Sequence, residues 1–293
     1  MTKLNILKTY KIFIGGAFPR TESGRYYKVW DAKKNLLANA CLSSRKDFRN
    51  AVVAARKAFD GWSTRTHFNR GQILYRIAEM LEGRKAQFVE ELIWQGGSKV
   101  AAEKEVQLSI DRCVYYSGWC DKYAALFSSV NPVASSHFNF SVPEPTGVVS
   151  IIAPEDSSLL GLLSVLLPVI AGGNTCVVLA SESKPLCAVT FAEVLATSDL
   201  PGGVVNIITG NSQELHTHFS NHMDVNAVIY CRENAIEQKT IAENASLNVK
   251  RSFVWNKDWL KNDHQNPYLI QDLQEIKTTW HPIENIGIAG AKY

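Results

Sequence analysis

The chain has 293 residues, of which 46% are hydrophobic and 20% charged, and its formal net charge is +3. A chain of this size can bury one large core or two modest ones. Its basic residues are dispersed and form no lysine/arginine block, which argues against a nucleic-acid-binding protein.

The N-terminal region, residues 10–127, is predicted to be helical over most of its length. Ser44 is placed to cap the segment RKDFRNAVVAARKAFDGW, in which apolar residues recur at spacings of three and four. The segment NRGQILYRIAEMLEGRKAQFVEELIW and the residues from 99 to 127 continue the same period. The first 16 residues contain no apolar segment followed by a small-residue cleavage site, so we predict no secretory signal.

Residues 148–255 show a different pattern, in which short apolar runs alternate with helical segments. The runs are rich in β-branched residues, as expected for strands that are buried on both faces: VVSIIA (148–153), TCVVLA (175–180), VVNIIT (204–209), AVIYC (227–231) and, more weakly, SFVW (252–255). Right-handed crossovers between such strands give a doubly wound α/β unit with a parallel sheet. We therefore predict the α/β class, with a Rossmann-like sheet and an N-terminal helical region.

Residues 159–173 are the most apolar stretch of the chain, but they are too few to span a bilayer and include Pro168. They predict a buried core helix and no contact with a membrane. The six cysteines form no C-x-x-C pair, so we expect reduced thiols in a cytoplasmic protein.

Two segments outside the βα units are predicted to form strands. HFNFSVPEP (137–145) alternates apolar and polar residues and indicates an exposed or edge strand. The polar stretch 256–272 is expected to be a loop. QEIKTTWHPI (274–283) indicates one more strand, and GIAGAKY (287–293) a tail.

Several motifs, in this order, resemble the aldehyde dehydrogenase superfamily: YKIFIGGAF, AVVAARKAFDGW, YYSGWCDK, EPTGVVSIIAP, AGGNTCVVLA, DLPGGVVNIITG and NVKR. The resemblance implies a Rossmann-like NAD(P)-binding domain. It also implies a reaction in which a cysteine thiolate attacks an aldehyde, hydride passes to the nicotinamide, and a glutamate-activated water releases the acid.

The positions that carry this chemistry in the family hold other residues here. Glu155 and Asp156 replace the tryptophan and the oxyanion-stabilising asparagine, and an ionised Asp156 is only an acceptor. The alternative role for Asp156 or Ser157 is to cap the helix that we expect to start near residue 158. Glu182 follows the second strand without the family's lysine, and it could meet a ribose hydroxyl or remain a solvated loop carboxylate.

Further substitutions lie at the positions that, in the family, bind the pyrophosphate and supply the general base, and Cys231 is considered as a substitute for the missing nucleophile. Arg232 and Glu233 occupy the Gly-Ser position, where Arg232 could bind phosphate or remain solvated. Trp255 stands where the family has its catalytic glutamate. Cys231, at a strand end, is a candidate reactive thiol, with core packing as the alternative. The histidines at 216, 218 and 222 could bind a metal or mark an exposed helix end.

The closing strand, 273–283, resembles the strand that ends full-length members of the family. In the family this strand pairs with the hairpin corresponding to 128–147 and forms the oligomerisation element. Here 256–272 would be a linker that replaces the catalytic domain. The alternative is that 273–283 covers the chain's own sheet edge.

The sequence therefore predicts an aldehyde dehydrogenase-like protein without catalytic activity, acting as an oligomerising or accessory subunit. Its partner would be itself or a full-length aldehyde dehydrogenase. The alternative is an NAD(P)-dependent oxidoreductase subunit whose catalytic cysteine comes from a partner. A third possibility is a small-ligand binder that uses Glu155, Asp156 and Arg232. We assign no catalytic residue and no metal ligand, and name Glu182 and Arg232 as candidate cofactor contacts.

Overall fold

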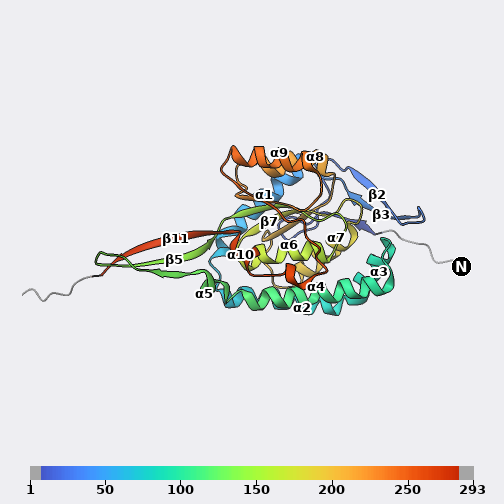
Figure 1. Ribbon diagram of the computed structural model, residues 1–293. Helices are drawn as coiled ribbons and strands as arrows, with labels where there is room; N and C mark the ends of the chain where they lie inside the picture. Colours follow the sequence, from blue (N-terminus) through green and yellow to red (C-terminus); the bar gives the residue numbers. More distant parts are fainter. Residues whose placement is uncertain (1–7, 284–293) are drawn as a thin grey trace, which may run out of the picture.

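The central element is a parallel sheet of five strands in the order β10-β9-β6-β7-β8 (Figure 1). The computed structural model describes residues 8–283, so the predicted tail 287–293 and the first seven residues lie outside it. All five predicted runs form strands: β6 Val148–Ile152, β7 Thr175–Leu179, β8 Val205–Ile208, β9 Ala227–Tyr230 and β10 Arg251–Val254. The Rossmann-like fold is confirmed.

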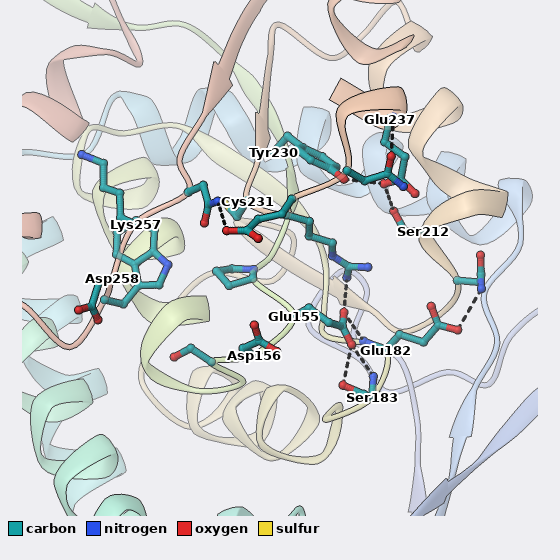
Figure 2. Close-up of a pocket in the computed structure, with 18 of the residues that line it drawn as sticks. Glu155, Asp156, Glu182, Ser183, Ser212, Tyr230, Cys231, Glu237, Lys257 and Asp258 are labelled. Atoms are coloured by element: carbon teal, nitrogen blue, oxygen red, sulfur yellow. Dashed lines mark hydrogen bonds and ion pairs between the residues drawn. The ribbon is translucent and has the colours of Figure 1, made fainter. Parts of the chain in front are cut away.

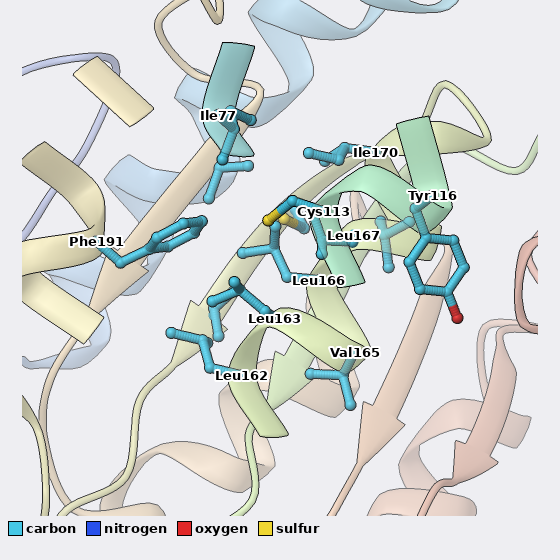
Figure 3. Close-up of a cluster of buried hydrophobic side chains, with 14 of the residues drawn as sticks. Ile77, Cys113, Tyr116, Leu162, Leu163, Val165, Leu166, Leu167, Ile170 and Phe191 are labelled. Carbon is cyan, nitrogen blue, oxygen red and sulfur yellow. The ribbon is translucent and has the colours of Figure 1, made fainter. Parts of the chain in front are cut away.

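Helices cover both faces of this sheet (Figure 1). One face packs against the crossover helices α6 and α7, and the other against α8 and α9. Their bounds are α6 Leu160–Ala171, α7 Leu186–Ala196, α8 Ser212–Asn221 and α9 Ala235–Ser246. Every residue of α6 is buried, because this helix lies between the sheet and a further helical layer (Figure 3). The predicted core helix is therefore confirmed.

The N-terminal helices complete the two layers. They are α1 Arg45–Ser63, α2 His67–Gly83, α3 Lys85–Trp94, α4 Lys99–Trp119 and α5 Tyr123–Phe127. The α1 helix joins α8 and α9 on one face, whereas α2 and α4 pack over α6 on the other. Ser44 caps α1 as predicted, in a capping box with Asp47.

A small three-stranded sheet precedes α1 and was not predicted. It comprises β1 Thr9–Tyr10, β2 Tyr26–Trp30 and β3 Leu36–Cys41, in the order β1-β3-β2. The β2–β3 turn contains Lys34 at a φ of 63°, and the Asp31 carboxylate accepts hydrogen bonds from the N–H groups of Lys33 and Asn35. Thus the region 10–127 is not helical throughout.

A second three-stranded sheet forms an arm that projects from the body (Figure 1). Its order is β11-β5-β4, with β4 Ser129–Asn131, β5 His137–Pro145 and β11 Gln274–Pro282. The β11 and β5 strands pair antiparallel over nine residues. The prediction of an edge position for 137–145 was wrong, because β5 is the central strand of the arm.

The segment between β10 and β11 packs against the body. It contains a short 3-10 helix, Asn262–His264, and the helix α10, Tyr268–Gln271, where the sequence indicated only a loop. Trp259, Leu269 and Ile270 are buried, and Arg112 of α4 donates a hydrogen bond to the Trp259 carbonyl at 3.1 Å. These contacts fix the path of the chain from the sheet to the arm.

All six cysteines are buried free thiols, as expected for a reduced protein. Between residues 8 and 283, no helix combines the length and apolar character that crossing a bilayer requires.

Candidate functional site

A crevice opens at the carboxyl ends of the parallel strands (Figure 2). Its volume is about 910 Å³, and its lining comes from the loops after β6, β7, β8, β9 and β10. The β6 strand pairs with β7 on one side and β9 on the other, so the strand order reverses here. Such a switch point is where open α/β sheets bind their ligands.

Arg232 follows β9 and its side chain crosses the crevice floor. Its Nε donates to the carbonyl of Ala153 and its Nη2 to that of Ala180, both at 3.1 Å. The same Nη2 lies 3.1 Å from Oε2 of Glu155. With these three acceptors the side chain is only 12% exposed. The alternative of a solvated arginine was therefore wrong, because the ends of β6 and β7 present acceptors that enclose the guanidinium.

Glu155, just after β6, places its carboxylate against the loop that follows β7 (Figure 2). Its oxygens accept from the N–H groups of Glu182 (3.1 Å) and Ser183 (2.8 Å) and from the hydroxyls of Ser181 (3.1 Å) and Ser183 (2.7 Å). Burial by itself would raise the pKa of Glu155, but Arg232 and the hydrogen bonds outweigh it, so the pKa lies below its ordinary 4.5. The group is an anion at neutral pH.

Glu182 and Asp156 lie in the same crevice but do not join this ion pair. The Asn211 amide donates to Glu182 Oε1 at 3.0 Å, so Glu182 is a half-buried, bound carboxylate rather than a freely solvated one. The backbone carbonyl of Asp156 accepts from Lys184 Nζ at 3.2 Å. The structure thus brings Glu155, Glu182 and Arg232 into one wall of the site.

Of the two residues predicted to cap the start of α6, Ser157 bonds its first turn and Asp156 does not. The helix begins at Leu160, two residues later than expected, and Asp156 makes no side-chain cap. Ser157 Oγ accepts from the Gly161 N–H at 2.8 Å, which supports the role considered for this residue. Oε1 of Glu105, on α4, accepts from the N–H groups of Leu159 and Leu160 at 3.2 Å. Nothing in the sequence pattern pointed to Glu105, because α4 is distant along the chain from this turn.

A second buried carboxylate borders the crevice from α9. Glu237 is 6% exposed, and its Oε2 accepts from the hydroxyls of Ser212 and Tyr230, both at 2.8 Å. It lay in no motif, so sequence reasoning missed it. These hydroxyls engage one carboxylate oxygen and tie α9 to the end of β9.

The other candidates show no reactive or metal-binding arrangement. Cys231 is buried, which raises the pKa of its thiol and opposes formation of the thiolate. Trp255 is buried as well, with its backbone N–H donating to the Tyr230 carbonyl. Within the described part of the chain, no group of three or more metal-ligating side chains occurs, so the histidines near the end of α8 form no such site.

The lining of the crevice is acidic. Of its charged side chains, two are cationic, Arg232 and Lys257, and seven are carboxylates: Glu105, Glu155, Asp156, Glu182, Glu233, Glu237 and Asp258. Such a surface repels phosphate groups unless cations offset it locally. Of these two cations, Arg232, whose side chain is largely enclosed, is already paired with Glu155.

The family model described as "Aldehyde dehydrogenase family" matches residues 19–254. The chain belongs to the aldehyde dehydrogenase family. It is 30% identical over 248 residues to "Putative aldehyde dehydrogenase DhaS" of Bacillus subtilis, covering 83% of this chain and 49% of that protein. It is 29% identical over 255 residues to "Cytosolic 10-formyltetrahydrofolate dehydrogenase" of Mus musculus, covering 85% of this chain and 28% of that one.

Solved structures give the same family and fold. An aldehyde dehydrogenase from Bacillus cereus, in complex with NAD+, superposes with a TM-score of 0.79 at 25% identity. A putative aldehyde dehydrogenase from Burkholderia cenocepacia superposes with a TM-score of 0.80 at 27% identity. These matches cover 84% and 83% of this chain but 50% of each neighbour. The chain thus spans half or less of these aldehyde dehydrogenase relatives.

NAD is the cofactor that this family implies, and the crevice does not fit it. Residues 181–183 and Arg232 stand at the positions that the resemblance assigned to the ribose and the pyrophosphate. The Glu155 carboxylate lies between them and contacts both. A dinucleotide at these positions would have to displace an ionised side chain that already has a cation and several hydrogen-bond donors.

Proposed function

We propose that this chain is a non-catalytic member of the aldehyde dehydrogenase family that acts as an oligomerising or accessory subunit. One observation carries this proposal: Glu155 and Arg232, at the positions assigned to the cofactor, are paired with each other on the crevice floor. The rest of the crevice wall is acidic, which also disfavours a dinucleotide.

The residues at the reacting positions support the same proposal. Asp156 stands where the family offers an amide donor, and loss of one such donor costs about 10²–10³ in rate. Trp255 cannot accept a proton from water and is buried. Cys231, at the end of β9, is buried as a neutral thiol. Within the described residues, no thiol is paired with a base that would activate it.

The arm supports an assembly role, because it exposes apolar side chains that its own sheet does not cover. Val130 is 68% exposed, Phe138 46% and Trp280 57%. Conversely, Asn139 and Ser141 of β5 are buried, and the Asn131 side-chain amide donates a hydrogen bond to each of them. By the strand register, Val130 and Phe138 lie on one face of the arm and Trp280 on the other, so both faces offer apolar contacts to a partner.

The outer edge of β11 offers hydrogen bonds to a partner strand. Within residues 8–283 no strand pairs with this edge. The N–H of Thr146 donates to the Leu273 carbonyl, and the N–H of Ile283 to the Ser136 carbonyl, so odd-numbered β11 residues bond to β5. Even-numbered residues, Thr278 among them, direct their backbone groups outward. An open edge of this kind can extend a sheet into a second subunit.

A proline at Thr278 tests this role, because it removes an outward N–H and leaves the ladder to β5 intact. Thr278→Ala is the matched control, since both variants lose the hydroxyl that contacts Ser141. Sedimentation velocity should show oligomers for the wild type and the alanine variant, and a shift to monomer for the proline variant. The same series is run with a full-length aldehyde dehydrogenase from the same source.

Two results would contradict the proposal. The first is a monomeric wild type that also fails to bind the full-length enzyme. The second is NAD-dependent aldehyde oxidation by the purified chain alone.

A further inference from the structure

We propose that the loop after β7 and Arg232 form an oxyanion-binding site that the chain fills with its own Glu155 carboxylate. In this role Glu155 is a built-in competitor, which keeps phosphate groups out of the crevice. The inference concerns the crevice alone and is independent of how the chain assembles.

The donors around Glu155 are arranged as they would be around a bound anion. Two consecutive N–H groups, of Glu182 and Ser183, point at the carboxylate together with the hydroxyls of Ser181 and Ser183. Successive N–H groups that converge in this way form a nest for anions. Ser181 is buried, and its single hydroxyl hydrogen is shared between the backbone carbonyl of Glu155 at 2.8 Å and the carboxylate at 3.1 Å, so the loop and the turn are held together.

Arg232 supplies the positive charge of the site. Its guanidinium is fixed by the carbonyls of Ala153 and Ala180, and neither contact depends on Glu155. The cation therefore keeps its place when Glu155 is removed, with its Nη2 aimed at the vacated position. A fixed guanidinium beside backbone N–H groups suits a small oxyanion such as phosphate.

The neighbouring carboxylates do not take over this role. Glu182 contributes its N–H to the nest, whereas its carboxylate is bound by Asn211. Glu237 is held by Ser212 and Tyr230. Removing the Glu155 side chain therefore leaves donors without an acceptor, whereas removing the Glu182 side chain leaves the nest occupied.

The test compares the wild type with Glu155→Ala and Glu182→Ala, which change the net charge equally. Thermal unfolding is followed in inorganic phosphate and in potassium chloride of equal ionic strength, and ³¹P line width reports binding directly. We expect Glu155→Ala alone to bind phosphate, with a melting temperature that rises by about 3 °C at roughly ten times Kd. Adding Arg232→Met to Glu155→Ala should abolish the response.

Three results would overturn the proposal. They are an equal phosphate response in the wild type, no response in folded Glu155→Ala, or a response that survives the loss of Arg232. If Glu155→Ala does not fold in chloride, the proposal predicts that phosphate restores folding. Failure to fold in both salts would then count against it.

Discussion

Replacing Arg232 by methionine tests the energetics of the Glu155–Arg232 ion pair on the crevice floor. The change keeps the length of the stem and removes the guanidinium, so two carbonyls lose a charged donor and Glu155 loses its counter-ion. Breaking a buried ion pair from one side costs about 3–5 kcal/mol. The Glu155 side chain is 32% exposed and keeps its bonds to the β7 loop, so we expect the lower end of that range, about 3 kcal/mol at pH 7.

The loss should depend on pH in a defined direction. Arg232 holds the pKa of Glu155 below its ordinary 4.5, so its stabilising effect is complete above pH 4.5. It is lost as the pH falls through the folded-state pKa. Without Arg232, burial raises the pKa and Glu155 takes up its proton at a higher pH. The stability difference between wild type and Arg232→Met is therefore constant near neutrality. It begins to shrink as the pH falls through the higher pKa of Glu155 in the variant, and it goes on shrinking down to the folded-state pKa of the wild type.

Urea unfolding at pH 7.5, 5.5 and 4.0 measures this difference. Lys184→Met is the control, because Lys184 is half-buried and also donates to a carbonyl of this turn, and its loss should cost about 1 kcal/mol or less. An Arg232→Met midpoint equal to that of the wild type at pH 7.5 would show that the ion pair contributes no stability. A difference that grows as the pH falls would contradict the expected pH dependence.

Two further predictions concern the base of the arm and the thiols. Asn174 is buried, accepts from the Gly147 N–H at 2.9 Å and donates to the Leu273 carbonyl at 3.0 Å, so Asn174→Ala should cost about 2–3 kcal/mol in urea unfolding. Amide exchange in β11 should also accelerate in that variant, and unchanged exchange would show that Asn174 does not stabilise the base of the arm. Because all six thiols are buried, and burial raises the pKa of Cys231, the native protein should not react with a thiol-specific disulfide reagent at pH 8, and the unfolded chain should react at six thiols. Rapid labelling of one native thiol would show a reactive cysteine.

The βα units were predicted closely, because their strands are buried on both faces and carry an uninterrupted apolar signal. The run 148–153 corresponds to β6 within one residue. The N-terminal sheet was missed since its strands are short and pair across a turn that depends on Asp31. The position of β5 within the arm was harder to predict, because Asn139 is a polar residue that is buried there. Its partner, Asn131, lies opposite it only once β4 and β5 have paired.

The residues at the strand ends were named from the sequence, but the ion pair between Glu155 and Arg232 was not. Sequence position placed Glu155, Glu182 and Arg232 at neighbouring strand ends, and all three line one crevice in the structure. It gave no indication that Glu155 and Arg232 would neutralise each other, because this requires the side-chain conformations. Glu105 and Glu237 project from helices, where nothing in the local pattern distinguishes them from solvated residues.

Titration of the wild-type chain with NAD+ at pH 7.5, followed by calorimetry and by tryptophan fluorescence, tests the central claim most directly. Trp259 borders the crevice and would report a ligand bound there. Since Glu155 and Arg232 already satisfy each other, we predict no saturable binding, that is, a Kd weaker than about 1 mM. Saturable binding with a Kd in the micromolar range would contradict the account, because the ion pair would then have yielded to a dinucleotide.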